Sequence, residues 1–331
     1  MNPTLRFRQL VTLAGLTAVE TLRRPLCLLL TTACVVLTVL TPMLTLHSFG
    51  EDGRLARDSG LAFHFVFGLL VAGYGACSSL SREMQSGTAS AVLSKPVSRD
   101  VFFLAKFLGI AMVLAAFSMC AGAATLLSER VAEKYAFYSD ASGYITDWRT
   151  AQSLLVAVVL AYLLAALLNI TARRPFQSTA FGLLAVCLLG AFVLAGFFTR
   201  AGHWAPFDFA VQWRILPASM LVTAGLLVLA AIAAALATRL PMLPTLTLCL
   251  GLFFLGLMSD YLLGRVADRS LVAGVAYRLV PNWQHFWMPD ALRDGGTIPV
   301  RYMLHTLGYA AAYAAGILAL GVFSFRNAEM K

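Results

Sequence analysis

The feature that most constrains this chain is a set of apolar segments, each about 20 residues long or longer. A helix of about 20 residues covers about 30 Å, the hydrocarbon thickness of a bilayer. Because hydrocarbon cannot satisfy backbone polar groups, segments of this length predict membrane-spanning helices. The eight segments are Leu26–Leu46, Leu61–Leu80, Val101–Leu127, Ala151–Ile170, Phe176–Phe198, Ile215–Ala237, Leu243–Leu263 and Met303–Phe325.

The composition agrees with a membrane protein. Of the 331 residues, 60% are hydrophobic and 12% are charged, whereas soluble domains carry about 25% charged residues. A membrane β-barrel would show short alternating strands instead. The sequence therefore predicts an all-α, polytopic fold with about eight transmembrane helices. Pro241 and Pro244 separate the sixth and seventh segments, so residues 215–263 are two full spans or a re-entrant pair.

Two regions are expected along the chain. Residues 1–25 place polar side chains at helical spacing and end at Pro25, which predicts an N-terminal interfacial amphipathic helix. Residues 26–331 form the transmembrane domain. The expected outer loops are His47–Gly60, Ser128–Thr150, Thr199–Arg214 and Gly264–Tyr302.

The net charge of +9 is best explained by topology. The basic residues form no large cluster, so nucleic acid is not an expected partner. With the N-terminus in the cytoplasm, Lys and Arg are denser in the short cytoplasmic loops, as the positive-inside rule requires. We therefore expect both termini in the cytoplasm of a bacterial cell, with the chain in its cytoplasmic (inner) membrane.

Two outer loops are rich in aromatic residues. Trp204 and Phe207 lie in one, and Trp283, Phe286 and Trp287 lie in the other. Such residues commonly form an aromatic belt at the membrane interface. The alternative is that they form an outer gate beside a substrate route.

The last apolar segment carries small residues at Gly308, Ala312 and Gly316, four positions apart. This spacing lets two helix backbones approach closely. It predicts a packing surface, either within the chain or across a dimer.

The chain lacks the motifs of an energy source or of an enzyme. It contains no P-loop, no HExxH and no G-x-S-x-G pattern. Three ionisable residues lie near the ends of spans: Glu83, Lys106 and Asp260. An ion-coupled pump would instead need such groups inside the membrane. We predict no catalytic, cofactor-binding or metal site, and infer that a separate motor drives the protein.

The polar segment between the second and third spans has a pattern of its own. It predicts a short cytoplasmic helix within residues 82–99, which Pro96 ends, and Ser98 can cap the span that follows. An ordinary interfacial loop is the alternative. The pattern consists of Glu83, Gly87-Thr88, Leu93-Ser94-Lys95-Pro96-Val97-Ser98-Arg99 and Lys106-Phe107-Leu108-Gly109.

This pattern resembles the cytoplasmic coupling element of type-2 ABC exporter permeases. The resemblance implies an ABC ATPase subunit as partner, with ATP and Mg²⁺ on that subunit, and a dimer with a second permease copy or a paralogue. Six spans are typical of the family, so residues 151–198 resemble an inserted hairpin. The residues that the resemblance assigns to ATPase coupling are Glu83, Gly87, Thr88, Leu93, Pro96 and Arg99.

A second function class stays open. The chain could be a stand-alone membrane carrier, or an integral-membrane enzyme that acts on lipid-linked substrates. An enzyme needs convergent polar groups in one cavity, and the spans offer Asp260, His64 and little else. Neither the substrate nor the direction of transport follows from the sequence.

Overall fold

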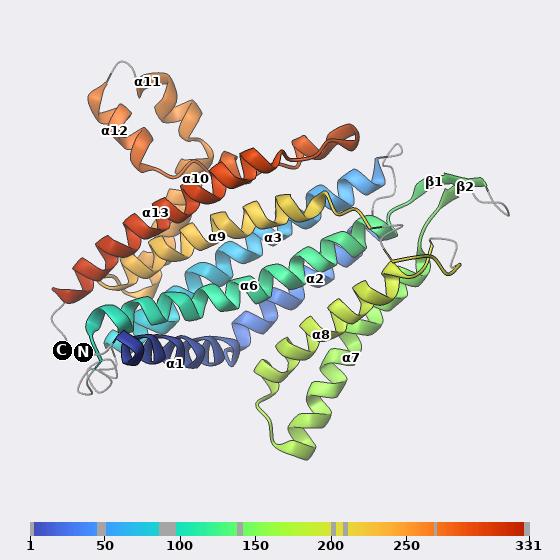
Figure 1. Cartoon of the computed structure of the whole chain (residues 1–331), viewed down its shortest axis with the longest axis horizontal. Helices are drawn as coiled ribbons and strands as arrows, with labels where there is room; N and C mark the ends of the chain where they lie inside the picture. Colours follow the sequence, from blue (N-terminus) through green and yellow to red (C-terminus); the bar gives the residue numbers. More distant parts are fainter. Residues whose placement is uncertain are drawn as a thin grey trace.

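A computed structural model of the chain shows one bundle of long helices (Figure 1). It describes residues 3–44, 51–85, 97–137, 142–199, 203–207, 211–267 and 270–327. The first half contains α1 (Pro3–Leu22), α2 (Pro25–Leu44), α3 (Asp52–Ala76), a π-helical turn (Cys77–Ser81), α4 (Arg82–Gln85), α6 (Arg99–Val131), β1 (Lys134–Phe137) and β2 (Ser142–Ile145). The second half contains α7 (Trp148–Ala172), α8 (Phe176–Gly196), α9 (Ile215–Ala237), α10 (Met242–Leu257), a π-helical turn (Asp260–Gly264), α11 (Arg265–Ala267), α12 (Leu271–Leu279), two 3₁₀ turns (Trp283–Phe286 and Asp290–Gly295) and α13 (Val300–Arg326).

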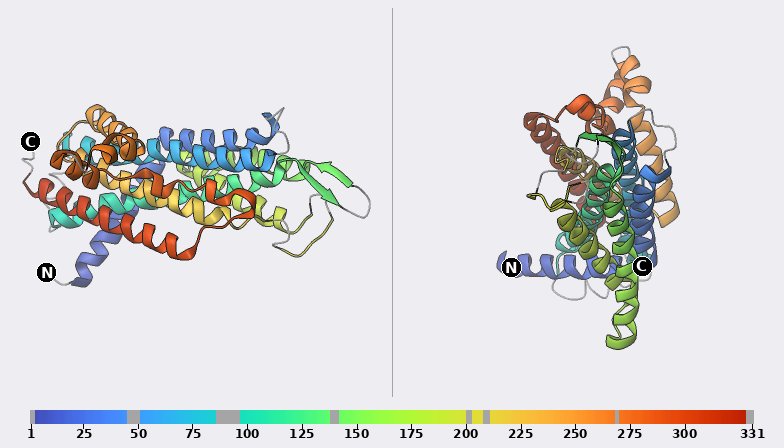
Figure 2. Two further views of the ribbon diagram at one scale, coloured as in Figure 1. Left: turned by 90° about the horizontal axis from the view of Figure 1, so that it is seen from above. Right: turned by 90° about the vertical axis from the view of Figure 1, so that its right-hand side faces the viewer.

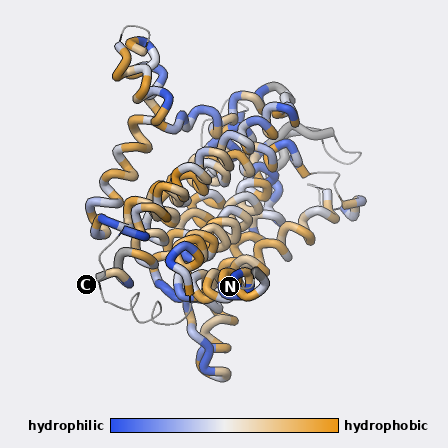
Figure 3. The backbone as a smooth tube through the Cα atoms, turned by 60° about the vertical axis from the view of Figure 1, so that its left-hand side comes forward, coloured by the Kyte–Doolittle hydropathy of each residue, from blue (hydrophilic) through white to orange (hydrophobic). Residues whose placement is uncertain are grey.

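Three helices form the centre of the bundle. α3, α6 and α9 carry buried residues along most of their length, whereas α7 and α13 are largely exposed. Hydrophobic residues dominate the long helices, and hydrophilic ones gather mainly near their ends (Figure 3). Both chain ends lie at the same end of the bundle, and α1 leaves it at an oblique angle (Figure 2). The fold is the polytopic all-α fold that the sequence predicts.

The number of spans agrees with the prediction. Among the described residues, seven helices are long and apolar enough to cross a membrane, and an eighth span is counted if one bent pair is included. The bent pair joins α10 to residues 260–267 at an angle of 62°. The seventh predicted span is therefore interrupted rather than straight.

The bend in that span has a local cause. Gly256 of α10 lies against the segment that returns to the bundle after α12. A Cβ at Gly256 would lie 2.3 Å from the carbonyl oxygen of Pro281. Just beyond it, the Asp260 carboxylate accepts hydrogen bonds from the Tyr277 hydroxyl at 2.8 Å and from the Asn282 amide at 3.0 Å. These contacts hold the polar turn against the returning segment and direct α11 and α12 away from the bundle axis.

The prediction of an outer loop over residues 47–60 is wrong for most of its length. α3 begins at Asp52, and Arg57 is buried within it. The Arg57 guanidinium donates to the Leu292 carbonyl oxygen at 3.0 Å and pairs with Asp58 at 2.9 Å. The helix therefore continues through a charged turn beyond the apolar segment, where the Leu292 carbonyl oxygen and Asp58 hold the Arg57 guanidinium.

The predicted outer loop 128–150 also contains regular structure. α6 continues to Val131, and β1 pairs antiparallel with β2, Lys134 opposite Ile145. Sequence patterning missed this two-stranded hairpin because each strand has four residues. A strand that short carries little periodic signal.

A buried cluster holds the α7–α8 hairpin to the bundle. Arg130 Nε lies 2.8 Å from Asp147 Oδ2, and the guanidinium also donates to the carbonyl oxygens of Ala195 and Phe198. Asp147 caps α7, because its carboxylate accepts from the Thr150 N–H at 3.0 Å. One arginine thus connects the end of α6 to the start of α7 and the end of α8.

We predict that Asp147→Ala lowers the free energy of unfolding by about 3 kcal/mol. The variant loses a helix cap and leaves the Arg130 guanidinium buried without its carboxylate. Asp147→Asn keeps the cap and should cost less. Thermal unfolding of the purified chain in detergent measures both, and an unchanged melting temperature for Asp147→Ala would contradict the prediction.

We also predict that cysteines at Glu133 and Arg174 label from opposite sides of the membrane. Both residues are exposed. Glu133 follows the end of α6, which lies beside the start of α7, and Arg174 follows the end of α7. Labelling with a membrane-impermeant maleimide, before and after permeabilisation, tests this. Labelling of both from one side would contradict the arrangement of α7 and α8.

Candidate functional site

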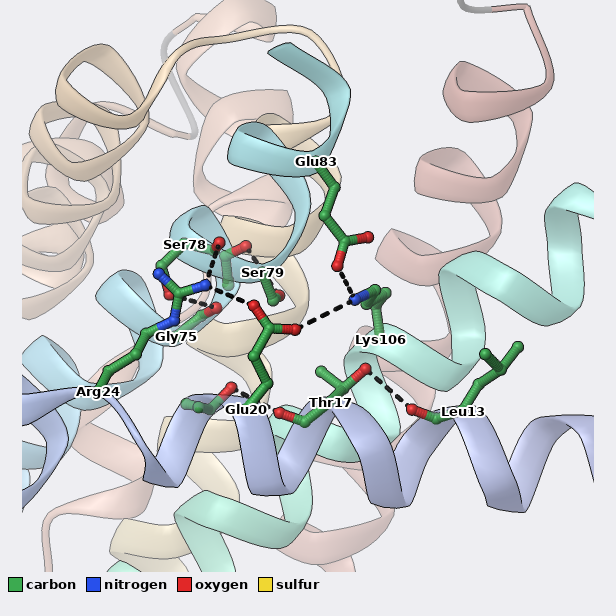
Figure 4. A network of polar contacts seen from close by, with 11 residues as sticks. Leu13, Thr17, Glu20, Arg24, Gly75, Ser78, Ser79, Glu83 and Lys106 are labelled. Atoms are coloured by element: carbon green, nitrogen blue, oxygen red, sulfur yellow. Dashed lines mark hydrogen bonds and ion pairs between the residues drawn. The ribbon is translucent and has the colours of Figure 1, made fainter. Parts of the chain in front are cut away.

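Four charged residues meet at the end of the bundle where α3 ends (Figure 4). Lys106 of α6 forms an ion pair with Glu83 of α4, and its Nζ lies 4.0 Å from Glu20 Oε2 of α1. Glu20 Oε1 accepts from Arg24 Nη2 at 2.7 Å. Figure 4 shows these side chains pointing toward one another from α1, α4, α6 and the turn between α1 and α2. We call this set the charged junction.

The backbone at the end of α3 is shaped for this junction. The chain passes from α3 into the π-helical turn Cys77–Ser81, a geometry that is rare and often occurs at functional sites. Arg24 Nη2 donates to the carbonyl oxygen of Ser78 at 3.2 Å. The hydroxyls of Ser78 and Ser79 donate to the carbonyl oxygens of Gly75 and Ala76, both at 3.3 Å. Side chains therefore satisfy carbonyl groups where the regular helix ends.

Lys106 is the centre of the charged junction. Its side chain is 9% exposed and that of Glu83 is 18% exposed, so both charges are largely removed from solvent. Burial raises the pKa of the Glu83 carboxyl, while the nearby Lys106 acts in the opposite direction. The Lys106 ammonium also lies 5.5 Å from the centroid of the Phe102 ring. A lysine this buried needs its carboxylate partners, because desolvating an unpaired charge costs several kcal/mol.

α1 reaches the junction because it packs directly on α6. A Cβ at Gly109 would lie 2.6 Å from the carbonyl oxygen of Ala14 and 2.6 Å from the Cβ of Thr17. Gly109 is therefore a position of close approach between the two helices. The spacing of Lys106 and Gly109 places the charge one turn from this contact.

A second group of contacts follows the polar segment. The Ser98 hydroxyl caps α6 by accepting from the Val101 N–H at 3.4 Å. Arg99 Nη1 donates to the carbonyl oxygen of Arg326 at 2.6 Å, and the Arg326 guanidinium pairs with Asp100. The start of α6 is thereby joined to the end of α13.

Of the residues that the sequence assigned to coupling, Glu83 and Arg99 are described. Glu83 joins α4 to α6, and Arg99 joins α6 to α13. Gly87, Thr88, Leu93 and Pro96 lie outside the described residues. The described residues near either side of them, Met84 and Val97, pack against the main hydrophobic core. Anything that moves residues 86–96 would therefore act on α6 and on the helices paired with it.

The five candidate gate residues fall into two sets. Trp204 is exposed and stacks on Phe197, with ring centroids 5.4 Å apart. Phe207 packs on the same ring at 5.3 Å.

The second set lies in the core. Trp283 and Phe286 are fully buried, and Trp287 stacks on Phe65 at 6.3 Å. A Cβ at Gly225 would lie 3.1 Å from the Phe286 ring. No ring contact found among the described residues joins the two sets, so the gate remains a prediction.

Sequence reasoning missed the contributions of Glu20, Arg24 and Arg326. Glu20 lies near the end of α1 and Arg24 just beyond it, four residues apart, which is the spacing of a helical ion pair, and this signal was present. Nothing in the sequence places α1 beside Lys106, or Arg326 beside Asp100, because those pairs form only when distant helices pack.

The fold defines a multi-pass α-helical membrane protein with a charged junction at one end. Residues 21–178 match a protein-family model described as ABC-2 family transporter protein. The match includes α2 to α7 and the whole of residues 83–99. It confirms the resemblance to ABC-2 type transporter permeases and supports a membrane permease of an ABC transporter. A search of curated proteins found no match.

We predict that Glu83→Ala lowers the free energy of unfolding by about 2 kcal/mol, because Lys106 keeps only a more distant carboxylate. Combining Glu83→Ala with Lys106→Met should recover part of the loss, since no unpaired charge then remains. Thermal unfolding in detergent is the measurement.

The matched control is Arg54→Ala at the opposite end of the bundle. Arg54 pairs with Glu51 at 2.7 Å, but the two side chains are 32% and 58% exposed. Exposed pairs contribute about 1 kcal/mol or less. A larger loss for Arg54→Ala than for Glu83→Ala would contradict the assignment of a buried junction.

Proposed function

We propose that this chain is the permease subunit of a bacterial ABC exporter, and that a separate ATPase subunit docks on residues 83–99. The observation that carries the proposal is the double anchoring of this segment. Glu83 joins α4 to Lys106 of α6, and Arg99 joins the start of α6 to Arg326 of α13. The family match over residues 21–178 supports the same reading.

In the proposed mechanism, the ATPase displaces residues 86–96 during its cycle. The displacement reaches α6 and α1 through the charged junction, and it reaches α13 through Arg99 and Arg326. The buried ion pair with Lys106 resists separation, since an unpaired charge in this position is costly. The helices therefore move with the segment.

Dimerisation with a second permease copy or a paralogue is part of the proposal. Gly308, Ala312 and Gly316 of α13 face outward, and a Cβ at either glycine would meet nothing within 4 Å. This small-residue face makes no close contact within the described part of the chain. It is suited to close packing against a helix of another subunit.

The proposed location is the bacterial cytoplasmic membrane, with export as the direction. The start of α1 and the end of α13 lie at the same end of the bundle as the start of α6 (Figure 1). If the ATPase docks there from the cytoplasm, both termini are cytoplasmic as well. ATP and Mg²⁺ would be held by the ATPase, because this sequence contains no P-loop.

Recovery of the ATPase with tagged permease from native membranes tests the proposal. Gly87→Trp should reduce ATPase recovery about tenfold, because overpacking a tight contact costs about 1–3 kcal/mol. The matched control is Glu133→Trp, an exposed position at the other end of α6, which should leave recovery unchanged. The isolated chain should release no phosphate from ATP.

If the Gly87→Trp variant recovers as much ATPase as the wild type, residues 83–99 do not form the interface with the ATPase. Absence of any ATPase from the wild-type preparation would favour the stand-alone carrier or the enzyme on lipid-linked substrates. Phosphate release by the homogeneous chain would contradict the division of labour between two subunits.

A further inference from the structure

A cavity of about 470 Å³ lies between α6, α8, α9 and α13, away from the charged junction. No Asp, Glu, Lys or Arg is among its lining residues. Met119, Met220 and Leu189 lie in its wall and are 45%, 50% and 36% exposed. Because these exposed side chains are apolar and belong to membrane-spanning helices, the cavity opens toward lipid rather than water.

Two buried serines and Thr223 carry the hydroxyl groups of the wall, and the Thr223 hydroxyl donates to the carbonyl oxygen of Ser219 at 2.8 Å. Ser118 of α6 and Ser219 of α9 each line the cavity and are each 6% exposed. Between them lies His64 of α3, which is fully buried. His64 Nε2 is 2.9 Å from Ser118 Oγ, and His64 Nδ1 is 3.4 Å from Ser219 Oγ. A Cβ at Gly122 would lie 3.0 Å from Ser219 Oγ, so the glycine leaves room for this hydroxyl.

These three groups leave one hydrogen-bond donor unused. A neutral imidazole donates from one nitrogen and accepts at the other. If Nε2 carries the proton it donates to Ser118, whose own O–H is then unused. If Nδ1 carries it, the O–H of Ser219 is unused. A charged imidazole would leave both unused. Neither hydroxyl has a further hydrogen-bond partner in the described part of the chain.

The unused donor lies in an otherwise apolar wall, close to the start of α9. Ser219 is the fifth residue of α9, about 6 Å from the start of that helix. The ring of Trp213, just before α9, lines the same cavity, and tryptophan favours the boundary between lipid chains and headgroups. A lipid whose acyl chain enters the groove from this end of α9 brings its ester carbonyl close to these serines, and an ester carbonyl is an acceptor without a charge.

We propose that this cavity binds a membrane lipid by one acyl ester, with the acyl chain in the apolar groove and the carbonyl oxygen accepting a hydrogen bond from Ser118 or Ser219. The absence of charged lining residues excludes a charged headgroup from the cavity, since a charge buried there would be unpaired. One side of the cavity is formed by α8, which belongs to the α7–α8 hairpin and contacts the bundle through Arg130. The proposal does not depend on the ATPase or on the coupling segment.

The test uses the purified full-length chain in detergent micelles with two uncharged probes. One is a diacylglycerol that carries a diazirine in one acyl chain. The other is the matched dialkylglycerol, in which ether linkages replace the esters. After photolysis, mass spectrometry measures labelling of residues 115–126 and 216–227 as a function of probe concentration, with unlabelled diacylglycerol as competitor.

We expect the diester to label the cavity saturably. The diether should bind with about fivefold lower affinity, measured as the probe concentration that gives half-maximal labelling. The double variant Ser118→Ala/Ser219→Ala should weaken diester binding by about fivefold, the factor for one net hydrogen bond. Ala115→Phe fills the cavity from a lining position that is itself exposed, and should abolish saturable labelling. Val159→Phe, on the exposed face of α7 at 58% exposure, is the matched control and should change nothing.

Unsaturable labelling, or labelling that Ala115→Phe leaves intact, would overturn the site. Equal affinity of the diester and the diether would overturn the ester assignment, as would equal affinity of the wild type and the double serine variant. If the double variant fails to fold, Ala115→Phe and the comparison of the two probes on the wild type still decide the question.

Discussion

The absence of water in the hydrocarbon layer is the constraint on which this structure depends. It requires every backbone group to pair within its own helix, and it makes any charge left inside costly unless a partner is found. The described residues show the effect of the second demand. The charged residues within the bundle stand near helix ends, and the buried ones are held in compact clusters, with Lys106 beside Glu83 at one end and Arg130 beside Asp147 at the other.

Both clusters share one helix. α6 runs from Arg99 to Val131, a length of about 50 Å at 1.5 Å per residue. It is joined at its start to α1, α4 and α13, and at its end to the α7–α8 hairpin through Arg130. A displacement at the polar segment 83–99 therefore has a continuous path to the opposite end of the bundle. The same helix carries Ser118, so the proposed lipid cavity lies along that path.

Close helix packing supports these polar contacts. Gly109 brings α1 against α6, and Gly256 allows the segment after α12 to return against α10. At both positions an added Cβ would meet backbone or a branched side chain, which cannot yield easily. Burial of the ion pairs is thus a consequence of close helix packing.

The sequence by itself determined the class of fold, because apolar segments about 20 residues long have one stable form in a bilayer. It also predicted the position of the proposed coupling segment, since Glu83, Arg99 and the Lys106–Gly109 run are local patterns. Only the tertiary structure decided which charges pair, because Glu20 meets Lys106 and Asp100 meets Arg326 across helices far apart in the chain. It likewise decided the bend after α10 and the meeting of His64 with Ser118 and Ser219. Hydropathy carries no information on such contacts, because they depend on which faces of the helices are turned toward one another.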